Sequence, residues 1–182
     1  MKNQIINISI CIFFTMAFVA CKKQGPATID NIKPNLIFEV SGVRKFFSDT
    51  DYTALGRLYL NPAINYNFTE SINDTGGVKR IQVSTDSLLR LSNVVSVPDH
   101  TSNNAIVTGN PIQIFEINGV ESNPFTSFIM SGKMVPNSST QQDSTIFIYC
   151  EGDDYNPNNT THIIIPCIIT NQPPNGYGWK RL

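Results

Sequence analysis

The acidic stretch at residues 151–159 holds the residue types and spacing that most readily suggest chemistry. It reads EGDDYNPNN, and Asp154, Asn156 and Asn158 follow the Asp-x-Asn-x-Asn spacing with which many calcium-binding loops begin. Carboxylate and amide oxygens are the ligands that Ca²⁺ prefers in proteins. The stretch is therefore a candidate calcium loop.

The rest of a helix–loop–helix calcium motif is missing. Asn159 stands at the sixth position in place of glycine, and Ile165 stands at the twelfth in place of glutamate. A looser oxygen cage that adds Glu151 and Asp153 to Asp154 stays open. The plainer interpretation, which we favour, is a solvated hairpin loop built from turn-forming residues. Apart from this calcium, the sequence indicates no cofactor.

Two aromatic residues near the C-terminus form a second candidate site. Tyr177 and Trp179 lie in the segment NGYGW, where glycines separate amphipathic rings. Such rings, next to Asn and Asp side chains, are typical of carbohydrate recognition. The alternative, which we favour, is that a terminal aromatic ring plugs one end of the core.

Motifs for catalysis are missing from the sequence. It holds no His-Glu-x-x-His, no glycine-rich phosphate loop and no Gly-x-Ser-x-Gly elbow. His100 and His162 are isolated, whereas a zinc site needs several ligands that converge. We interpret them as polar residues of a turn and of a strand edge. The sequence predicts no enzyme, although a dispersed catalytic set stays open.

The first 21 residues predict export. A lysine at position 2 is followed by the mostly apolar run Ile5–Val19 and then by Ala20 and Cys21. This run is shorter than the roughly 20 apolar residues that a membrane-spanning helix needs, and it fits a secretory leader. Phe18 is too bulky for an ordinary leader peptidase to cut after Ala20.

The segment Phe18–Cys21 resembles the lipobox of bacterial lipoproteins, in which the cysteine is acylated and becomes the mature N-terminus. Phe18 departs from the usual leucine of that motif. The resemblance implies a signal peptide at 1–20 and a membrane anchor through acyl chains, palmitate among them, on Cys21. Lys22-Lys23 resembles lipoproteins that are forwarded to the outer membrane of Gram-negative bacteria. The alternative is an exported soluble protein in which Cys21 is incidental.

The composition predicts a β-rich domain behind a tether. Charged residues make up 15% of the chain, below the roughly 25% usual for soluble domains, and Asn, Ser, Thr and apolar β-formers replace them. The formal net charge is −1 and no basic stripe is present, so we expect no nucleic-acid partner. Residues 21–34 read as a flexible, lipidated tether, and residues 35–182 as one domain.

Short alternating runs separated by turn residues predict an all-β fold, an antiparallel sandwich of about 7–9 strands. The clearest hairpin joins 64–70 to 78–84 through a turn at 73–77. Three further features are expected: a strand break at Ser92-Asn93, a bulge at Gly132, and an edge or bulged strand around Pro166, since proline donates no ladder hydrogen bond.

That hairpin also carries a resemblance. The pattern looks like a hairpin of immunoglobulin-like domains in bacterial exported proteins, and it covers about twenty residues, in line with short-range hairpin signals. It implies an immunoglobulin-like sandwich, and no functional residue is carried over from it. The residues that carry it are Tyr66, Phe68, Glu70, Gly76, Gly77, Val78, Ile81 and Val83.

Cys150 and Cys167 flank the same loop. If that loop closes a hairpin, they lie about five residues apart along the strands, well beyond the ~7 Å limit between the Cα atoms of a disulfide. We expect two buried free thiols, although a shifted register would bring them together.

Taken together, these features predict a lipid-anchored cell-envelope protein that acts as a binding or interaction module for a protein or glycan. Two alternatives stay open: an envelope enzyme that acts on glycans through a dispersed carboxylate site, and a structural subunit of an envelope assembly.

Overall fold

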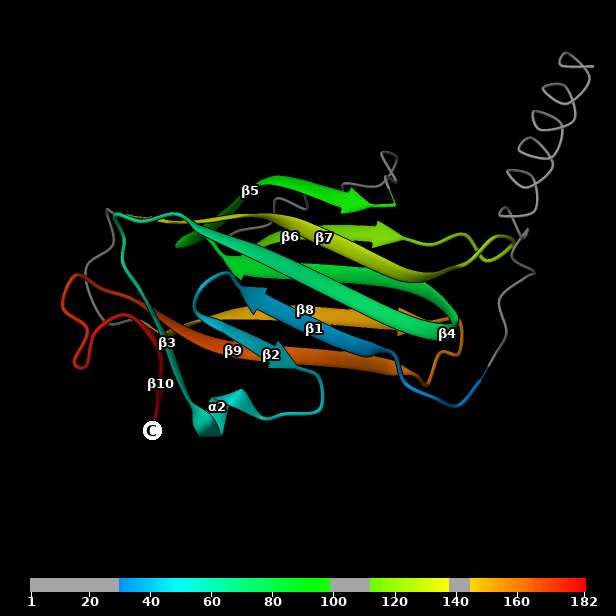
Figure 1. The fold of residues 1–182 in the computed structure, drawn as a ribbon, viewed down its shortest axis with the longest axis horizontal. Helices are drawn as coiled ribbons and strands as arrows, with labels where there is room; N and C mark the ends of the chain where they lie inside the picture. Colours follow the sequence, from blue (N-terminus) through cyan, green and yellow to red (C-terminus); the bar gives the residue numbers. More distant parts are fainter. Residues whose placement is uncertain (1–29, 99–111, 138–144) are drawn as a thin grey trace, which may run out of the picture.

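The computed structural model describes residues 30–98, 112–137 and 145–182. Within these ranges lie ten strands and one short helix (Figure 1). Their bounds are β1 Asn35–Val40, β2 Arg44–Phe47, α2 Tyr52–Leu55, β3 Gly56–Leu60, β4 Tyr66–Asp86, β5 Leu89–Val97, β6 Ile112–Asn118, β7 Phe125–Pro136, β8 Thr145–Asp154, β9 Thr160–Ile169 and β10 Gly178–Arg181.

Strand β4 organises the fold because it belongs to both layers. It is 21 residues long and folds back near its centre (Figure 1). Its first half pairs with β1 and β7, and its second half pairs with β6 and β8. The turn predicted at 73–77 therefore exists, but the predicted hairpin is wrong. The two halves lie in opposite layers and bond to other strands rather than to each other.

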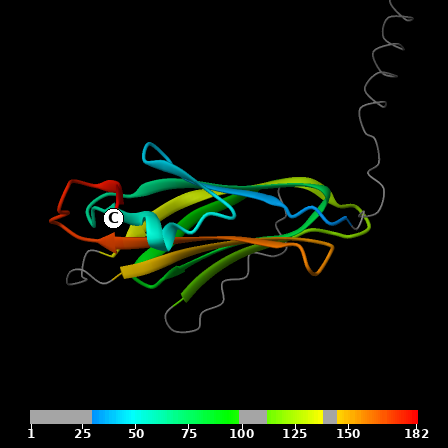
Figure 2. The same ribbon diagram turned by 90° about the horizontal axis from the view of Figure 1, so that it is seen from below.

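Two layers follow from this pairing, and Figure 2 shows them edge-on. One runs β2–β1–β4–β7–β5 through the first half of β4. The other runs β6–β4–β8–β9–β3–β10 through its second half. The all-β, immunoglobulin-like sandwich is confirmed, with ten strands among the described residues. One pair, β3 with β9, is parallel rather than antiparallel.

The extra strands were missed because β2 and β10 are four residues long and too short to show an alternating pattern. The segment between β2 and β4 combines a helical turn, α2, with a strand, β3, that follows it directly.

The core lies between the layers and is filled by alternate residues of each strand, as a half-solvated sheet requires. Phe38 and Phe68 stack across β1 and β4 with ring centroids 5.6 Å apart. No helix in the described part of the chain is long and apolar enough to span a membrane. The largest fully buried side chains are Tyr52, Phe38, Phe46, Phe68, Phe128, Leu36, Leu58, Leu60, Ile72, Ile81, Leu89 and Leu91.

The predicted strand break and bulge are one feature. The register between β5 and β7 shifts between Ser92 and Val95, where Asn93 has a positive φ of 52°. The extra residue lies in β5, not at Gly132 as expected. Gly132 instead makes room for it, because a Cβ atom there would lie 2.9 Å from Cε1 of Phe68 and 3.0 Å from the backbone oxygen of Ser92.

Pro166 lies where its strand has one neighbour. β9 pairs with β8 through Pro166, and β3 joins on the other side only from Cys167 onward. The missing N–H group therefore falls on an edge segment, as predicted.

The two thiols are buried and free. Cys150 pairs with Ile163, whereas Cys167 pairs with Ile146, four positions away along β8. The expectation of two separate core thiols is confirmed.

Candidate functional site

The pleat of β8 divides the predicted calcium ligands between two faces. Asp154 points inward, whereas Glu151 and Asp153 point outward. There Arg80 donates from Nε to Asp153 Oδ2 at 2.7 Å and from Nη2 to Glu151 Oε1, and it pairs with Glu116 at 3.4 Å. Two of the predicted ligands are thus neutralised on the outer face of the sheet. The set Glu151, Asp153, Asp154, Asn156 and Asn158 does not form one site.

The other predicted ligands shape the loop between β8 and β9. Asn158 is exposed, and its backbone N–H donates to Asn156 Oδ1 at 3.1 Å. Asp154 Oδ1 accepts from the backbone N–H of Asn156 at 2.5 Å. Asn156 Nδ2 then donates to the backbone oxygen of Asp30 at 2.6 Å. The end of the predicted tether is therefore tied to this loop.

Three aspartates from distant segments meet beside the loop, and we name them the acidic end. Asp30, Asp74 and Asp154 each contribute one carboxylate oxygen, and these three oxygens lie within 4.8 Å of one another. They come from the segment before β1, the bend of β4 and the end of β8. In the described part of the chain, this is the one group of three or more His, Cys, Asp or Glu side chains close enough to share a metal ion.

Asp74 is the most unusual member of the acidic end, since only 6% of its surface is exposed. Its Oδ1 accepts from the N–H groups of Gly76 at 2.6 Å and Gly77 at 2.9 Å. Its Oδ2 is buried without a hydrogen-bond partner. Burial raises the pKa of the Asp74 carboxyl; the two glycine amides oppose this shift, and the charges of Asp30 and Asp154 add to it.

Sequence reasoning missed Asp30 and Asp74 because neither lies near the loop in the chain. The available signal was the cluster Asp74-x-Gly76-Gly77, in which an aspartate can cap a turn through its own side chain.

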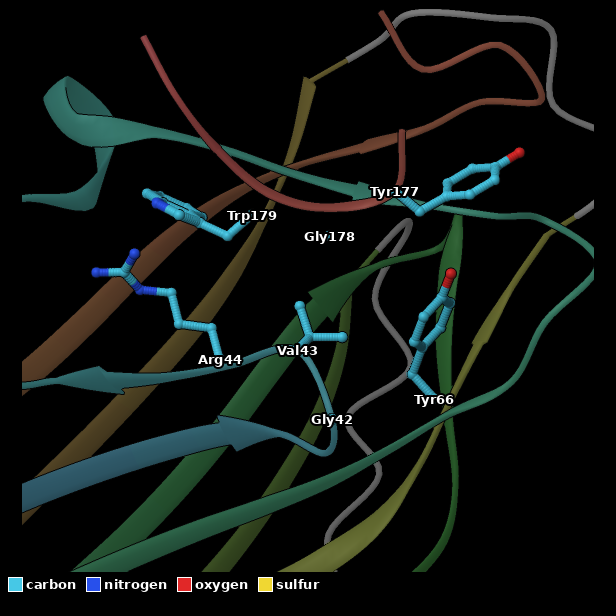
Figure 3. A pocket seen from close by; sticks show the side chains of 7 residues that line it. All are labelled: Gly42, Val43, Arg44, Tyr66, Tyr177, Gly178 and Trp179. Carbon is cyan, nitrogen blue, oxygen red and sulfur yellow. The ribbon is translucent and has the colours of Figure 1, made fainter. Parts of the chain in front are cut away.

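The opposite end of the sandwich carries an open pocket of about 450 Å³, which we name the aromatic end. It lies between the β1–β2 turn, the start of β4 and the segment leading into β10 (Figure 3). Tyr66 and Tyr177 lie on one side of it, and Arg44 and Trp179 lie on the other (Figure 3). Its lining residues are Gly42, Val43, Arg44, Tyr66, Tyr177, Gly178 and Trp179.

Trp179 closes the core at this end. Its ring meets Phe46 and Tyr52 edge to face, with centroids 5.2 Å and 5.7 Å apart. The guanidinium carbon of Arg44 lies 5.0 Å from the Trp179 ring centroid. A Cβ atom on Gly56 would lie 2.7 Å from Cζ2 of Trp179, so that glycine leaves space for the ring. These are the contacts of the core plug that the sequence analysis favoured.

Tyr177 is more exposed to solvent than Trp179, with 37% of its surface exposed. Its hydroxyl donates to the backbone oxygen of Asn171 at 3.2 Å. The Tyr66 hydroxyl accepts from the backbone N–H of Asn61 at 2.8 Å, which leaves its proton to donate elsewhere. Burial raises the pKa of Tyr66, and nearby Tyr177 adds to this. The Tyr66 phenol is therefore a neutral hydrogen-bonding group at physiological pH.

A buried carboxyl in the middle of the core was also missed. Glu70 has no exposed surface, and its polar neighbour is the thiol of Cys150 in the opposite layer. Neither carboxyl oxygen has a hydrogen-bond partner among the described residues. Burial raises the pKa of Glu70 well above its ordinary value, and burial followed by the Glu70 charge raises that of Cys150. The signal was present, since Glu70 alternates with Phe68 and Ile72 on the inward face.

His162 is exposed on β9 opposite Glu151, and His100 lies outside the described residues.

Comparison with known proteins yields no match to a family model and none to a curated protein. Among solved structures, the chain is similar to BcpA, the major pilin subunit of Bacillus cereus, with 14% identity and a TM-score of 0.46. That match covers 76% of this chain and 41% of the pilin, so the chain spans less than half of it. It is also similar to ACE19, the collagen-binding subdomain of the Enterococcus faecalis surface protein ACE, with 14% identity and a TM-score of 0.36. That match covers 68% of this chain and all of the subdomain. No functional residue is carried over from either.

Proposed function

We propose that this chain is an outer-membrane lipoprotein, anchored through acyl chains on Cys21, whose sandwich binds envelope glycans at the aromatic end. The observation that carries the proposal is the open pocket, which combines aromatic rings with an arginine. Residues 1–20 act as the signal peptide in this proposal.

The position of the pocket supports the proposal, because the pocket lies at the end of the sandwich opposite the anchored N-terminal segment. Strand β1 starts with Asn35 opposite Asn73, beside the bend of β4, and ends with Val40 opposite Phe68. The chain therefore reaches the sandwich at the acidic end and runs toward the aromatic end (Figure 1). An anchor that precedes Asp30 leaves the pocket on the side facing away from the membrane.

The chemistry of the lining suits a sugar ligand. The two tyrosine rings of the lining offer apolar faces and hydroxyl groups at once. In the described part of the chain, Arg44 has no ion pair, so its guanidinium is available to a carboxylate or phosphate on a glycan. None of the seven lining residues carries a carboxylate. The pocket thus offers groups for binding rather than the two carboxylates, about 5 to 9.5 Å apart, of a glycoside hydrolase.

The anchor is tested by growing a Gram-negative host that produces the chain with an alkyne-tagged palmitate. We expect label on the wild-type protein and on the control Cys11→Ala, because Cys11 lies within the leader. The Cys21→Ala variant should carry no label and should leave the membrane fraction. Label that persists on Cys21→Ala contradicts the anchor.

The binding site is tested on an array of bacterial envelope glycans. We expect Tyr177→Ala and Arg44→Gln to lose binding that the wild type shows. Tyr149→Ala is the matched control, because Tyr149 is 45% exposed on β8 and does not line the pocket. Equal binding by wild type and Tyr177→Ala would place the ligand elsewhere.

A further inference from the structure

We propose that the acidic end is a calcium site, in which Asp30, Asp74 and Asp154 hold one ion that fastens the segment before β1 to the sandwich. The proposal is independent of the ligand at the aromatic end. It replaces the loop-only ligand set with three carboxylates from three separate segments.

The spacing of the three carboxylates fits the size of calcium. Ca²⁺ binds oxygens at 2.3–2.6 Å, so two ligands of one ion are separated by at most about 5 Å. Oxygens of Asp30, Asp74 and Asp154 lie within 4.8 Å of one another. Mg²⁺ binds at 2.0–2.1 Å, which limits the separation of its ligands to about 4 Å and demands a stricter octahedron. Separations up to this bound of 4.8 Å can be accommodated by the larger ion.

Asp74 supplies the second, independent observation. Its side chain is more than nine-tenths buried, and Oδ2 has no partner although it is not exposed to solvent. Buried carboxylates are normally hydrogen-bonded, paired with a cation or bound to a metal. The cationic side chains that form ion pairs in the described residues are Lys45 and Arg80, and neither pairs with the acidic end. A metal ion would compensate this charge.

Neutral oxygens complete the surroundings. The backbone oxygens of Asp30 and Ile32 lie 3.1 Å and 3.2 Å from Nδ2 of Asn159, which also donates to Asp154 Oδ2 at 2.8 Å. Thr75 Oγ1 lies 3.2 Å from Asp30 Oδ2. Calcium takes six to eight oxygens, commonly carboxylates, backbone carbonyls and waters together. These groups can supply that number around the three aspartates.

The proposed ion would act as a clamp. It would join the segment at residues 30–32, the bend at 74–77 and the loop after β8, which are far apart in the sequence. Because the unfolded chain does not bring these segments together, calcium would bind the folded state alone and stabilise it.

The test uses the full 182-residue chain, purified in detergent and freed of metal with a chelator. Calcium chloride is titrated calorimetrically, and thermal unfolding is followed with and without about 10 mM calcium, above the millimolar range of weak extracellular modules. We expect one equivalent of Ca²⁺ to bind and the unfolding temperature to rise, with Mg²⁺ binding at least about tenfold more weakly. Absence of both heat and thermal shift with calcium would overturn the proposal.

A matched pair of variants tests the ligand assignment. Asp74→Asn keeps an oxygen to accept from Gly76 and Gly77, and we expect it to weaken calcium binding by about a factor of ten or more, because affinity follows the count of charged ligands. Asp153→Asn is adjacent to Asp154 but faces Arg80, so it should bind calcium like the wild type. Equal affinity in Asp74→Asn and wild type, or equal losses in both variants, would refute the assignment.

Two further measurements keep the proposal testable if Asp74→Asn does not fold. Asp30→Asn changes a partly exposed residue, and we expect a similar loss of affinity from it. In the wild type, calcium should slow hydrogen exchange of the backbone amides at residues 31–33. Unchanged exchange at saturating calcium would rule out the clamp.

Discussion

The two ends of the sandwich deal with charge in opposite ways. At the aromatic end, Arg44 lies over the rings of Phe46, Tyr52 and Trp179, at 5.0 to 5.8 Å from their centroids. Those rings meet one another edge to face at 5.0 to 5.7 Å. A single cation is thus balanced by the π-faces of neutral side chains, which is favourable without any added ligand.

The acidic end brings like charges together instead. Asp30, Asp74 and Asp154 receive hydrogen bonds from backbone and side-chain N–H and hydroxyl groups, but no ion pair from a described residue. Each such hydrogen bond stabilises a carboxylate, yet mutual repulsion remains. The charge of Arg44 is therefore met by side chains of the same chain, whereas the acidic end has the composition of a site that a cation completes. Substitutions at the two ends should respond differently to calcium.

The largest effect is expected from Trp179→Ala at the aromatic end. Removing a ring that closes the core should lower the free energy of unfolding by about 3 kcal/mol, at the lower end of buried aromatic truncations because the ring is only partly buried. Urea denaturation should show the same loss with calcium and with chelator. A loss seen only in calcium would contradict the independence of the two ends.

Next in size is Gly77→Ala, in the bend that holds Asp74. Gly77 has φ of +111°, and a Cβ atom there would lie 2.6 Å from Cβ of Pro124. We expect a loss of about 2 kcal/mol, from backbone strain and from the collision. Gly42→Ala at the aromatic end is the control, because Gly42 has φ of +73° but no atom within 4 Å of the added Cβ. Gly42→Ala should lower the free energy of unfolding by about 1 kcal/mol. Equal losses in the two variants would show that the collision with Pro124 does not contribute.

Glu70 lies between the two ends. Its substitution tests whether this carboxyl governs how the free energy of unfolding depends on pH. Burial raises the folded-state pKa of Glu70 above its ordinary value of 4.5. Above pH 4.5, the folded state therefore holds a proton that the unfolded chain has released. Stability therefore falls as the pH rises through this window, by about 1.4 kcal/mol per pH unit for one proton. Glu70→Gln should remove this component of the slope.

The control for Glu70 is Glu39→Gln, on the outward face of the neighbouring strand, where Glu39 pairs with Lys45 at 3.3 Å. The measurement is the free energy of unfolding between pH 5 and 8 for all three proteins, in chelator. Parallel pH profiles for wild type and Glu70→Gln would show that Glu70 does not govern the slope.

The local parts of this structure could be predicted from the sequence, and the contacts between distant segments could not. Alternation at 64–70 and 78–84 correctly indicated strands with inward Phe68, Ile81 and Val83. Whether two neighbouring strands pair or lie in opposite layers depends on their other partners, and β1, β6, β7 and β8 are spread over more than a hundred residues. The hairpin was wrong for that reason.

The same reasoning explains the acidic loop. Sequence spacing placed Asp153 and Asp154 in one group, but the pleat of a strand sends adjacent side chains to opposite faces. β8 continues to Asp154. A strand predicted from the sequence to end there would have placed Asp154 on the opposite face from Asp153 and Glu151. Asp30 and Asp74 could be added only by the fold, since nothing local links residue 30 to residue 154.

The smallest effect on stability is expected from Tyr177→Ala, two residues before Trp179. Tyr177 is partly exposed and contributes one hydrogen bond, to the backbone of Asn171. Its loss should lower the free energy of unfolding by about 0.5 kcal/mol, the scale of surface substitutions. Urea denaturation alongside Trp179→Ala measures the contrast directly. If Tyr177→Ala costs as much as Trp179→Ala, both rings belong to the core plug, and the aromatic end has no side chain to spare for a ligand. A small cost means that the aromatic end divides its two rings between closing the core and meeting the solvent.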